Sequence, residues 1–296
     1  MSTNALYRCA NIRRACLLIA GMVLSVMQAH AKPPFVWLKA VNSSPSSGVE
    51  NRDIDGSTAA LLFPLVSTDM PQQIEANFER QFKLLETVPD ACSGKKIYTV
   101  QRANHLYYSD LPQLFSVGLR LYVREDAAFL PALQAISFQG EISLLELSEK
   151  LPKLMMGAVA GRSYTAELDM LLQQFAQRSR LWLRHADDMA TGMTLMLALN
   201  RVDAVIEYPT IMAGITQAKP LKLRSFSIKE TPAFTTGYIV CAATAQGQAL
   251  ITRFNKAIAL ASKNRSYLEA HLKWFDPALH AEITRYYNAL YGTQFK

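Results

Sequence analysis

The stretch Leu199–Pro209, with the sequence Leu-Asn-Arg-Val-Asp-Ala-Val-Ile-Glu-Tyr-Pro, decides the fold class of this chain. Apolar residues spaced three and four apart over 189–197 predict a helix that runs into it. The β-branched run Val205-Ile206 then predicts a buried strand, which the final proline ends. Glu207 and Tyr208 follow directly, and in open α/β sheets ligands bind at the carboxyl ends of strands. The alternative is an ordinary helix–strand unit whose Glu and Tyr only meet solvent.

The first 31 residues have the pattern of a secretory signal peptide. Three arginines make a basic start, a 13-residue apolar run from Ala15 to Met27 follows, and Ala29-His30-Ala31 matches a cleavage site. The apolar run is shorter than the roughly 20 residues that cross a bilayer. We therefore expect a signal peptide at residues 1–31, location in the periplasm, and a mature protein that is soluble and does not span a membrane.

The composition is typical of a globular protein with a packed core. Of the 296 residues, 50% are hydrophobic and 19% are charged. The formal net charge of +7 falls to +4 when the leader, with three arginines and no acid, is removed. The remaining basic residues are scattered and form no dense stripe, so the sequence does not predict binding to nucleic acid.

Cys92 and Cys241 are the two cysteines that remain after the leader. An oxidising compartment and an even count favour a disulfide between them. In the chain-entropy account, closing so long a loop contributes on the order of 4–5 kcal/mol to stability. Two buried free thiols are the alternative.

Alternating strands and helices predict an α/β protein with two lobes. The expected strands are Phe35–Leu38, Ile97–Val100, Ser116–Val123, Met155–Val159 and Tyr238–Cys241. Helices are expected over 57–66, 74–85 and 168–175 and through most of the C-terminal region, with a loop over 42–56 and a turn over 88–96. We expect residues 32–123 and 231–296 to form lobe 1 and residues 124–230 to form lobe 2, inserted in the first, with a hinge between them.

Enzyme signatures are absent from the sequence. The four histidines after the leader lack the His-Glu-x-x-His spacing, and no Gly-x-Ser-x-Gly motif occurs. The methionines of 189–197 lie at core spacing without His or Cys, which favours core packing over metal binding. We therefore expect no catalytic residue, no metal and no cofactor, although paired carboxylates from distant segments would still allow a secreted hydrolase.

A glycine turn, Gly161-Arg162-Ser163-Tyr164, follows a predicted strand and precedes a predicted helix. A strand, glycine turn, hydroxyl and helix in this order offer free backbone N–H groups to an anion. Arg162, Ser163 and Tyr164 are therefore candidate ligand-binding residues. The alternative is that Ser163 only caps the helix.

Several of these stretches resemble the periplasmic solute-binding proteins of family 3, which serve polar amino-acid ABC importers. The closest likeness is to a poorly characterised branch with a Cys near position 92. The resemblance spans nearly the whole mature chain and is carried by short motifs: Thr99-Val100-Gln101-Arg102, Tyr107-Tyr108-Ser109-Asp110, Gly161-Arg162-Ser163-Tyr164, Asn200-Arg201-Val202-Asp203-Ala204, Gly237–Val240 and Gly247–Ala257.

The resemblance implies a two-lobed, type II periplasmic-binding fold that closes on a small ligand without covalent chemistry. It implies that Arg102 pairs with a ligand carboxylate, a role suited to a planar guanidinium, unless Arg102 is a plain surface arginine. It also implies that Ser163 and nearby N–H groups bind the same carboxylate. Amino-acid binders place an aspartate that meets the ligand ammonium where this chain has Tyr208, preceded by Glu207.

The first loop departs from the family pattern. Residues 43–48, Ser-Ser-Pro-Ser-Ser-Gly, lack the aromatic residue that often clasps the ligand. The resemblance therefore implies either a ligand that differs from an amino acid, or a weakened site in a protein that acts as a periplasmic partner. The expected partners are a small anionic or zwitterionic solute and an ABC permease or a membrane sensor, with the protein itself a monomer.

Overall fold

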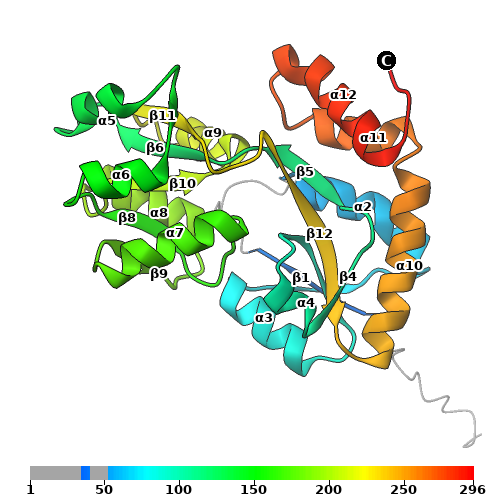
Figure 1. The fold of residues 1–296 in the computed structure, drawn as a ribbon. Coiled ribbons are helices and arrows are strands. Elements are labelled where there is room, and N and C mark those ends of the chain that lie inside the picture. Colours follow the sequence, from blue (N-terminus) through cyan, green and yellow to red (C-terminus); the bar gives the residue numbers. More distant parts are fainter. Residues whose placement is uncertain (1–34, 41–52) are drawn as a thin grey trace, which may run out of the picture. The chain divides into compact units, whose positions relative to one another are not determined.

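Two mixed β-sheets carry the fold (Figure 1), and each contains six of the described strands. The computed structural model describes residues 35–40 and 53–296. The expected signal peptide and most of the loop expected over 42–56 lie outside these residues. No described helix is long and apolar enough to cross a membrane.

The first sheet has the order β2-β1-β3-β12-β4, and β5 pairs with the start of β12. Helices α2, α10, α11 and α12 pack on one face of this sheet, and α3 packs on the other. We call this sheet with its helices the first lobe. Its strands are β1 (Val36–Lys39), β2 (Gln72–Glu75), β3 (Ala91–Lys96), β4 (Leu106–Tyr108), β5 (Leu114–Val117) and β12 (Phe234–Ala242). Its helices are α2 (Ile54–Val66), α3 (Phe78–Thr87), α4 (Val100–Ala103), α10 (Ala245–Ala261), α11 (Arg265–Leu272), the 3-10 turn η1 (Pro277–Leu279) and α12 (His280–Tyr291).

The second sheet has the order β7-β11-β6-β10-β8-β9. Helices α5, α6 and α7 pack on one face, and α8 and α9 pack on the other. We call this sheet with its helices the second lobe. Its strands are β6 (Arg120–Arg124), β7 (Glu141–Ile142), β8 (Met156–Val159), β9 (Leu181–Arg184), β10 (Ala204–Glu207) and β11 (Leu223–Ile228). Its helices are α5 (Leu130–Ile136), α6 (Leu144–Lys150), α7 (Ala166–Gln177), α8 (Met189–Ala198) and α9 (Pro209–Ala218).

Strand β10 confirms the interpretation of the stretch 199–209. It lies in the second sheet between β6 and β8, with α8 before it and α9 after it. Ile206 faces the cluster under α5–α7, whereas Val205 faces the cluster under α8 and α9. Burial on both faces explains why the strand reads as a continuous apolar run. Pro209 begins α9, where its fixed φ suits the first helical position.

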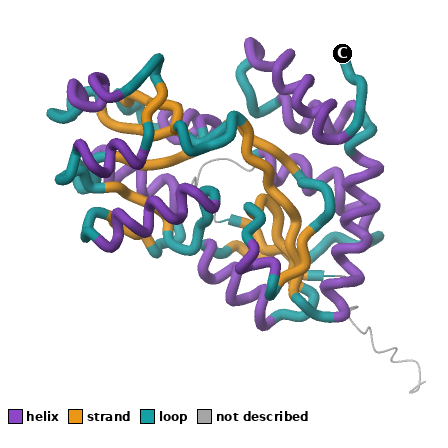
Figure 2. Tube along the Cα trace, viewed as in Figure 1, coloured by secondary structure: helices purple, strands orange, loops and turns teal. Residues whose placement is uncertain are grey.

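Two connections join the lobes, and they touch each other (Figure 2). One is Gly118-Leu119, between β5 and β6, and the other is 229–233, between β11 and β12. The Gly118 N–H donates to the Ala233 carbonyl at 2.7 Å. The expected single strand Ser116–Val123 is thus two strands, because the chain changes sheets at Gly118. The sheet pairing places β6 in the second lobe, and the lobe boundaries at residues 123 and 231 stay predictions.

Substituting Gly118 with alanine should destabilise the protein. A Cβ at this position would lie 2.4 Å from the carbonyl oxygen of Pro232, so the two connections would have to separate. Crowding of this kind costs about 1–3 kcal/mol, and a lower urea midpoint would report it. Gly214→Ala is the matched control, because its Cβ would meet nothing within 4 Å and helix α9 should gain up to about 1 kcal/mol. Equal midpoints for the two variants would contradict the role assigned to Gly118.

Several local predictions were wrong in the first lobe. Helix α2 begins at Ile54 rather than Ser57, because the side chain of Asp53 accepts from the Gly56 N–H and caps the helix. The expected turn over 88–96 contains strand β3, and in place of the expected strand Ile97–Val100, residues 97–99 belong to no strand and Val100 begins helix α4. Ile74 lies in strand β2 and not in the helix that follows.

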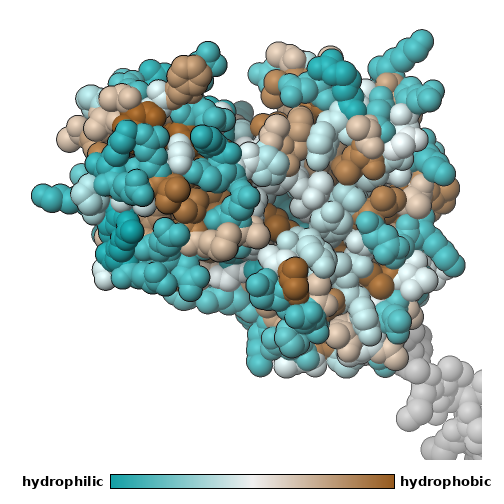
Figure 3. All heavy atoms as spheres, viewed as in Figure 1, coloured by the Kyte–Doolittle hydropathy of each residue, from teal (hydrophilic) through white to brown (hydrophobic). Residues whose placement is uncertain are grey.

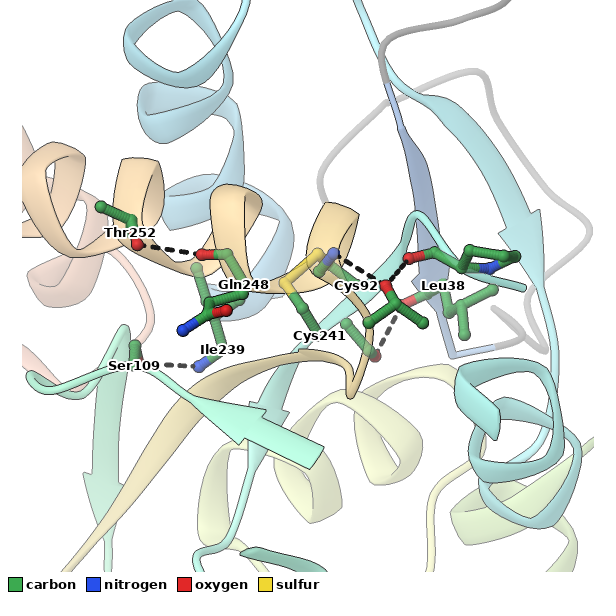
Figure 4. The surroundings of a disulfide bond; sticks show 11 residues. Leu38, Cys92, Ser109, Ile239, Cys241, Gln248 and Thr252 are labelled. Atoms are coloured by element: carbon green, nitrogen blue, oxygen red, sulfur yellow. Dashed lines mark hydrogen bonds between the residues drawn. A yellow bond between two sulfur atoms is a disulfide. The ribbon is translucent and has the colours of Figure 1, made fainter. Parts of the chain in front are cut away.

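The predicted disulfide between Cys92 and Cys241 is present. The two residues are cross-strand neighbours on β3 and β12, with Cα atoms 4.1 Å apart. Figure 4 shows the bond beside helix α10, which carries Gln248 and Thr252. Both cysteines are fully buried in the cluster that joins this helix to the sheet. The disulfide is therefore part of the core of the first lobe.

The surface drawn in Figure 3 is mostly hydrophilic, and its hydrophobic residues form separate groups. Large hydrophobic side chains that remain exposed come from several elements, among them Met70, Phe138 and Met170. Isolated exposed side chains of this kind are normal for globular proteins.

Candidate functional site

A cavity of about 680 Å³ is lined by residues of both lobes. The first lobe contributes the start of α2, the end of β3 and part of β12, and the second lobe contributes the turn after β8 together with α8 and α9. Four of the six predicted ligand-binding residues line it: Arg102, Arg162, Ser163 and Tyr208. The other two, Tyr164 and Glu207, are buried and are not among its described lining residues.

Arg162 and Glu207 bind each other. The guanidinium donates to both carboxylate oxygens, at 2.7 and 2.8 Å, and only 8% and 4% of the two side chains is exposed. The guanidinium also lies over the rings of Tyr164 and Tyr208, 4.8 and 5.2 Å from their centroids. Burial alone would lower the pKa of Arg162, but the charge of Glu207 and its hydrogen bonds raise it overall. The pair is thus a charged clamp between the glycine turn and β10.

Asp169 occupies the glycine turn from within the protein. Its carboxylate accepts from the Ser163 hydroxyl and, at 2.8 Å, from the Tyr164 N–H. The helix cap of α7 is Thr165, so Ser163 does not cap the helix. The sequence analysis expected these two groups to donate to an anion of the ligand. In this structure they donate to the Asp169 carboxylate instead, and a ligand role for Ser163 remains a prediction.

Arg102 lies on the short helix α4 and faces the second lobe. Its Nη2 donates to the Gly161 carbonyl at 3.0 Å, and its guanidinium lies 4.1 Å from the centroid of the Phe82 ring. Burial lowers the pKa of Arg102, and interactions with Tyr108 oppose that effect. None of the ion pairs within residues 35–40 and 53–296 includes Arg102. Its charge is therefore available to an anion in the cavity.

Further contacts between the lobes lie near Gly161. The Nδ2 of Asn77 donates to Asp187 at 2.9 Å, and the imidazole of His185 lies 3.0 Å from the carboxylate of Glu79. Gly161 has a positive φ of 70°, and a Cβ there would lie 2.7 Å from the Glu79 side chain. Glycine is thus required both by the backbone conformation and by the close approach of the first lobe.

Two charged residues that the sequence analysis did not identify, Asp55 and Lys96, also line the cavity. The ammonium of Lys96 donates to Gln81 at 2.7 Å and to the Gly94 carbonyl at 2.9 Å. Burial lowers the pKa of Lys96 to about 7, and the charge of Asp55 opposes that effect. Burial likewise raises the pKa of Asp55 to about 6, with a further contribution from Asp53. Both residues were missed because Asp55 fell in an expected loop and Lys96 in an expected turn.

The second lobe gives the cavity a largely uncharged wall. This wall is formed by α8 and α9, whose lining residues carry no charge; most are apolar or small, and Thr191, Thr194, Thr210 and Gln217 add polar groups. We call this surface the α8–α9 wall and define it by six residues: Leu195, Ala198, Ile211, Gly214, Ile215 and Ala218. Asp55, Lys96 and Arg102 of the first lobe, which form no ion pair with the described residues, therefore line the same cavity as this apolar surface of the second lobe.

Structural comparison relates this architecture to solute-binding proteins. A protein from a study of glutathione import through a cystine ABC importer of Streptococcus mutans is 16% identical, with a TM-score of 0.60 over 81% of this chain and 93% of that one. An ancestral arginine-binding protein bound to glutamine is 17% identical, with a TM-score of 0.59 over 81% and 96%. This chain has the type 2 periplasmic-binding fold. The predicted fold class, with two lobes and a hinge, is confirmed.

The type 2 periplasmic-binding fold also occurs in proteins with other roles. A histidine kinase sensor domain is 12% identical, with a TM-score of 0.61 over 82% of this chain and 97% of that one. An ancestral amino-acid-binding protein described as a precursor of cyclohexadienyl dehydratase is similar as well, at 17% identity and a TM-score of 0.55. The sequence matches no protein-family model and no curated relative. The similar structures are thus mostly binding proteins, and at these identities they establish the fold alone.

Proposed function

We propose that this protein is a periplasmic solute-binding protein that captures a small anionic or zwitterionic, amino-acid-like solute for an ABC importer. The solute binds in the cavity between the lobes, and the lobes close on it without covalent chemistry. The leader pattern of residues 1–31 supports export, and we propose that the protein acts as a monomer. The similar structures include substrate-binding proteins of amino-acid ABC transporters, which supports this assignment.

The observation that carries the proposal is a pair of cations without an ionic partner. Lys96 and Arg102 line the cavity from the first lobe, and neither forms an ion pair with a carboxylate of the described residues. Lys96 is buried and Arg102 is half-buried, and a cation that is removed from water is costly unless an anion pairs with it. A carboxylate of the solute would supply that anion, and the planar guanidinium of Arg102 suits it.

A sensing protein that uses the same fold without transport is the second candidate. The similarity to a histidine kinase sensor domain supports it. Both candidates need a solute in the cavity, and they differ in the partner that reads the closed form. A pull-down with the ligand-bound protein separates the two candidates. Capture of the permease encoded beside its gene favours import, and capture of a membrane sensor encoded there favours sensing.

Replacing Arg102 by alanine should abolish or greatly weaken solute binding. Loss of a buried charged hydrogen bond costs about 2–5 kcal/mol, which corresponds to a roughly 30-fold or larger increase in Kd. A thermal-shift screen of amino acids and organic acids identifies the solute, and calorimetry then measures Kd for Arg102→Ala. Arg80→Ala is the matched control, because Arg80 is an exposed arginine outside the cavity.

Two outcomes would contradict this proposal. One is a screen in which no amino acid and no organic acid stabilises the protein. The other is a solute whose Kd is the same for wild type, Arg102→Ala and Arg80→Ala. Turnover of esters or glycosides by the purified protein would favour a hydrolase instead.

A further inference from the structure

We infer that Asp55, on the first lobe, receives the ammonium group of the solute, and that the solute is an amino acid with an apolar side chain lying against the α8–α9 wall. This inference rests on the proposed function and makes it specific. It moves the ammonium contact away from Glu207 and Tyr208 on the second lobe. It also states which amino acids the cavity selects.

The other carboxylates near the cavity already have cationic or backbone partners. Glu207 binds Arg162 through both oxygens. Asp188 binds Arg184 in the same bidentate way. Asp53 caps α2 and lies 3.7 Å from the ammonium of Lys95. Asp55 is the exception among the cavity-lining carboxylates of the described residues, since its side chain is hydrogen-bonded by a neutral amide.

The position of Asp55 is fixed before any ligand arrives. Only 9% of the residue is exposed, and its Oδ1 accepts from the Nε2 of Gln113 at 2.9 Å. The same Nε2 also donates to Thr58, and the Oε1 of Gln113 accepts from the Lys95 N–H, so the amide itself is held in place. A carboxylate held in this way loses little conformational entropy when it binds a cation.

The anion-binding groups lie on the same lobe as Asp55. Lys96 follows Gly94 on β3, and a Cβ on Gly94 would lie 2.3 Å from the Asp55 carboxylate. Lys96 and Asp55 are therefore close neighbours around one glycine, and Arg102 lies six residues further along the chain. A zwitterion can thus place its carboxylate against the cations and its ammonium against Asp55 without a charged contact to the second lobe.

The apolar wall then accounts for the rest of the solute. The six residues of the α8–α9 wall have no charged group, and their small members at 198, 214 and 218 leave room for a side chain. Burying an aliphatic or aromatic side chain against such a surface is favourable in proportion to its area.

Wild-type protein tests the chemistry of the solute directly. Three amino acids, L-leucine, L-methionine and L-phenylalanine, serve as probes in calorimetry. Each is compared with the acid that lacks its amino group and the amine that lacks its carboxyl group, for leucine 4-methylpentanoate and 3-methylbutylamine. We expect at least one amino acid to bind about 30-fold or more tightly than both of its analogues.

The variant Asp55→Asn tests the assigned contact. It keeps an acceptor for Gln113 and removes the charge, so the preference for the amino acid over its desamino acid should fall from about 30-fold to about threefold or less. This ratio is measured within one variant, so a general loss of stability does not imitate the effect. Asp69→Asn, an exposed aspartate outside the cavity, should keep the wild-type ratio.

The possible results separate this inference from the proposed function. A ratio that stays at the wild-type value in Asp55→Asn overturns the ammonium site. A solute that is a simple organic acid or a polar amino acid overturns the solute class, while the proposed function stands. No binding of any amino acid or organic acid overturns both.

Discussion

Replacing Cys92 and Cys241 by alanine should lower the free energy of unfolding by about 4–5 kcal/mol. The disulfide joins residues 149 positions apart, so its loss frees a long loop in the unfolded chain. Both residues are also fully buried, so the truncated side chains leave a small void beside α10. Urea unfolding followed by circular dichroism measures the change.

Dithiothreitol supplies the control for the disulfide. Wild-type protein unfolded in urea with the reductant should approach the midpoint of the double variant, whereas the double variant should not respond to the reductant. A double variant as stable as the oxidised wild type would show that the cross-link adds nothing to the core of the first lobe.

Replacing Glu207 by glutamine should lower the free energy of unfolding by nearly as much as loss of the disulfide. The variant leaves the Arg162 guanidinium buried between two tyrosine rings without its counter-charge. Breaking a buried ion pair on one side costs about 3–5 kcal/mol. The urea midpoint should fall accordingly. Glu146→Gln, which removes an exposed ion pair with Lys150 on α6, should change stability by less than about 0.5 kcal/mol.

A double-mutant cycle isolates the clamp itself. Arg162→Met combined with Glu207→Leu removes both charges and keeps most of the volume, so it should destabilise less than either single substitution. If the two single losses simply add in the double variant, the two residues do not act as a pair.

The segment 189–209 of the second lobe could be read from the sequence because its local signals agree with its tertiary structure. The helical spacing over 189–197 corresponds to α8, the β-branched pair to β10, and the proline to the end of that strand and the start of α9. The methionines of α8 are buried in a hydrophobic cluster, which confirms the prediction that they are core residues. Strand β10 is buried on both faces between the helices, so its residues 204–206 form a continuous apolar run, which is a strong signal even in a short strand.

Strand β3 could not be read in this way. Gly94 suggested a turn, but the structure shows that glycine is needed there because a Cβ would lie 2.2 Å from the Gln113 side chain and 2.3 Å from Asp55. The reason for the glycine is a contact with residues 19 and 39 positions away. A single sequence contains no sign of such a contact.

The candidate site was predicted only in part for a similar reason. Arg162 and Glu207 were both identified as charged residues near the ends of strands, and the structure places them together. The sequence did not predict that they pair with each other across 45 residues, or that the Ser163 hydroxyl donates to Asp169. Both contacts depend on how separate segments pack. Asp55 and Lys96 were missed because no local pattern marks them.

The disulfide has a topological consequence for the second lobe. Residues 92 and 241 enclose every strand of the second sheet, from β6 to β11. The inserted half is therefore a closed covalent ring emerging from the other half. A protease that cuts one peptide bond anywhere within it opens the ring but releases no fragment, so the nicked protein stays a single molecule until it meets a reductant.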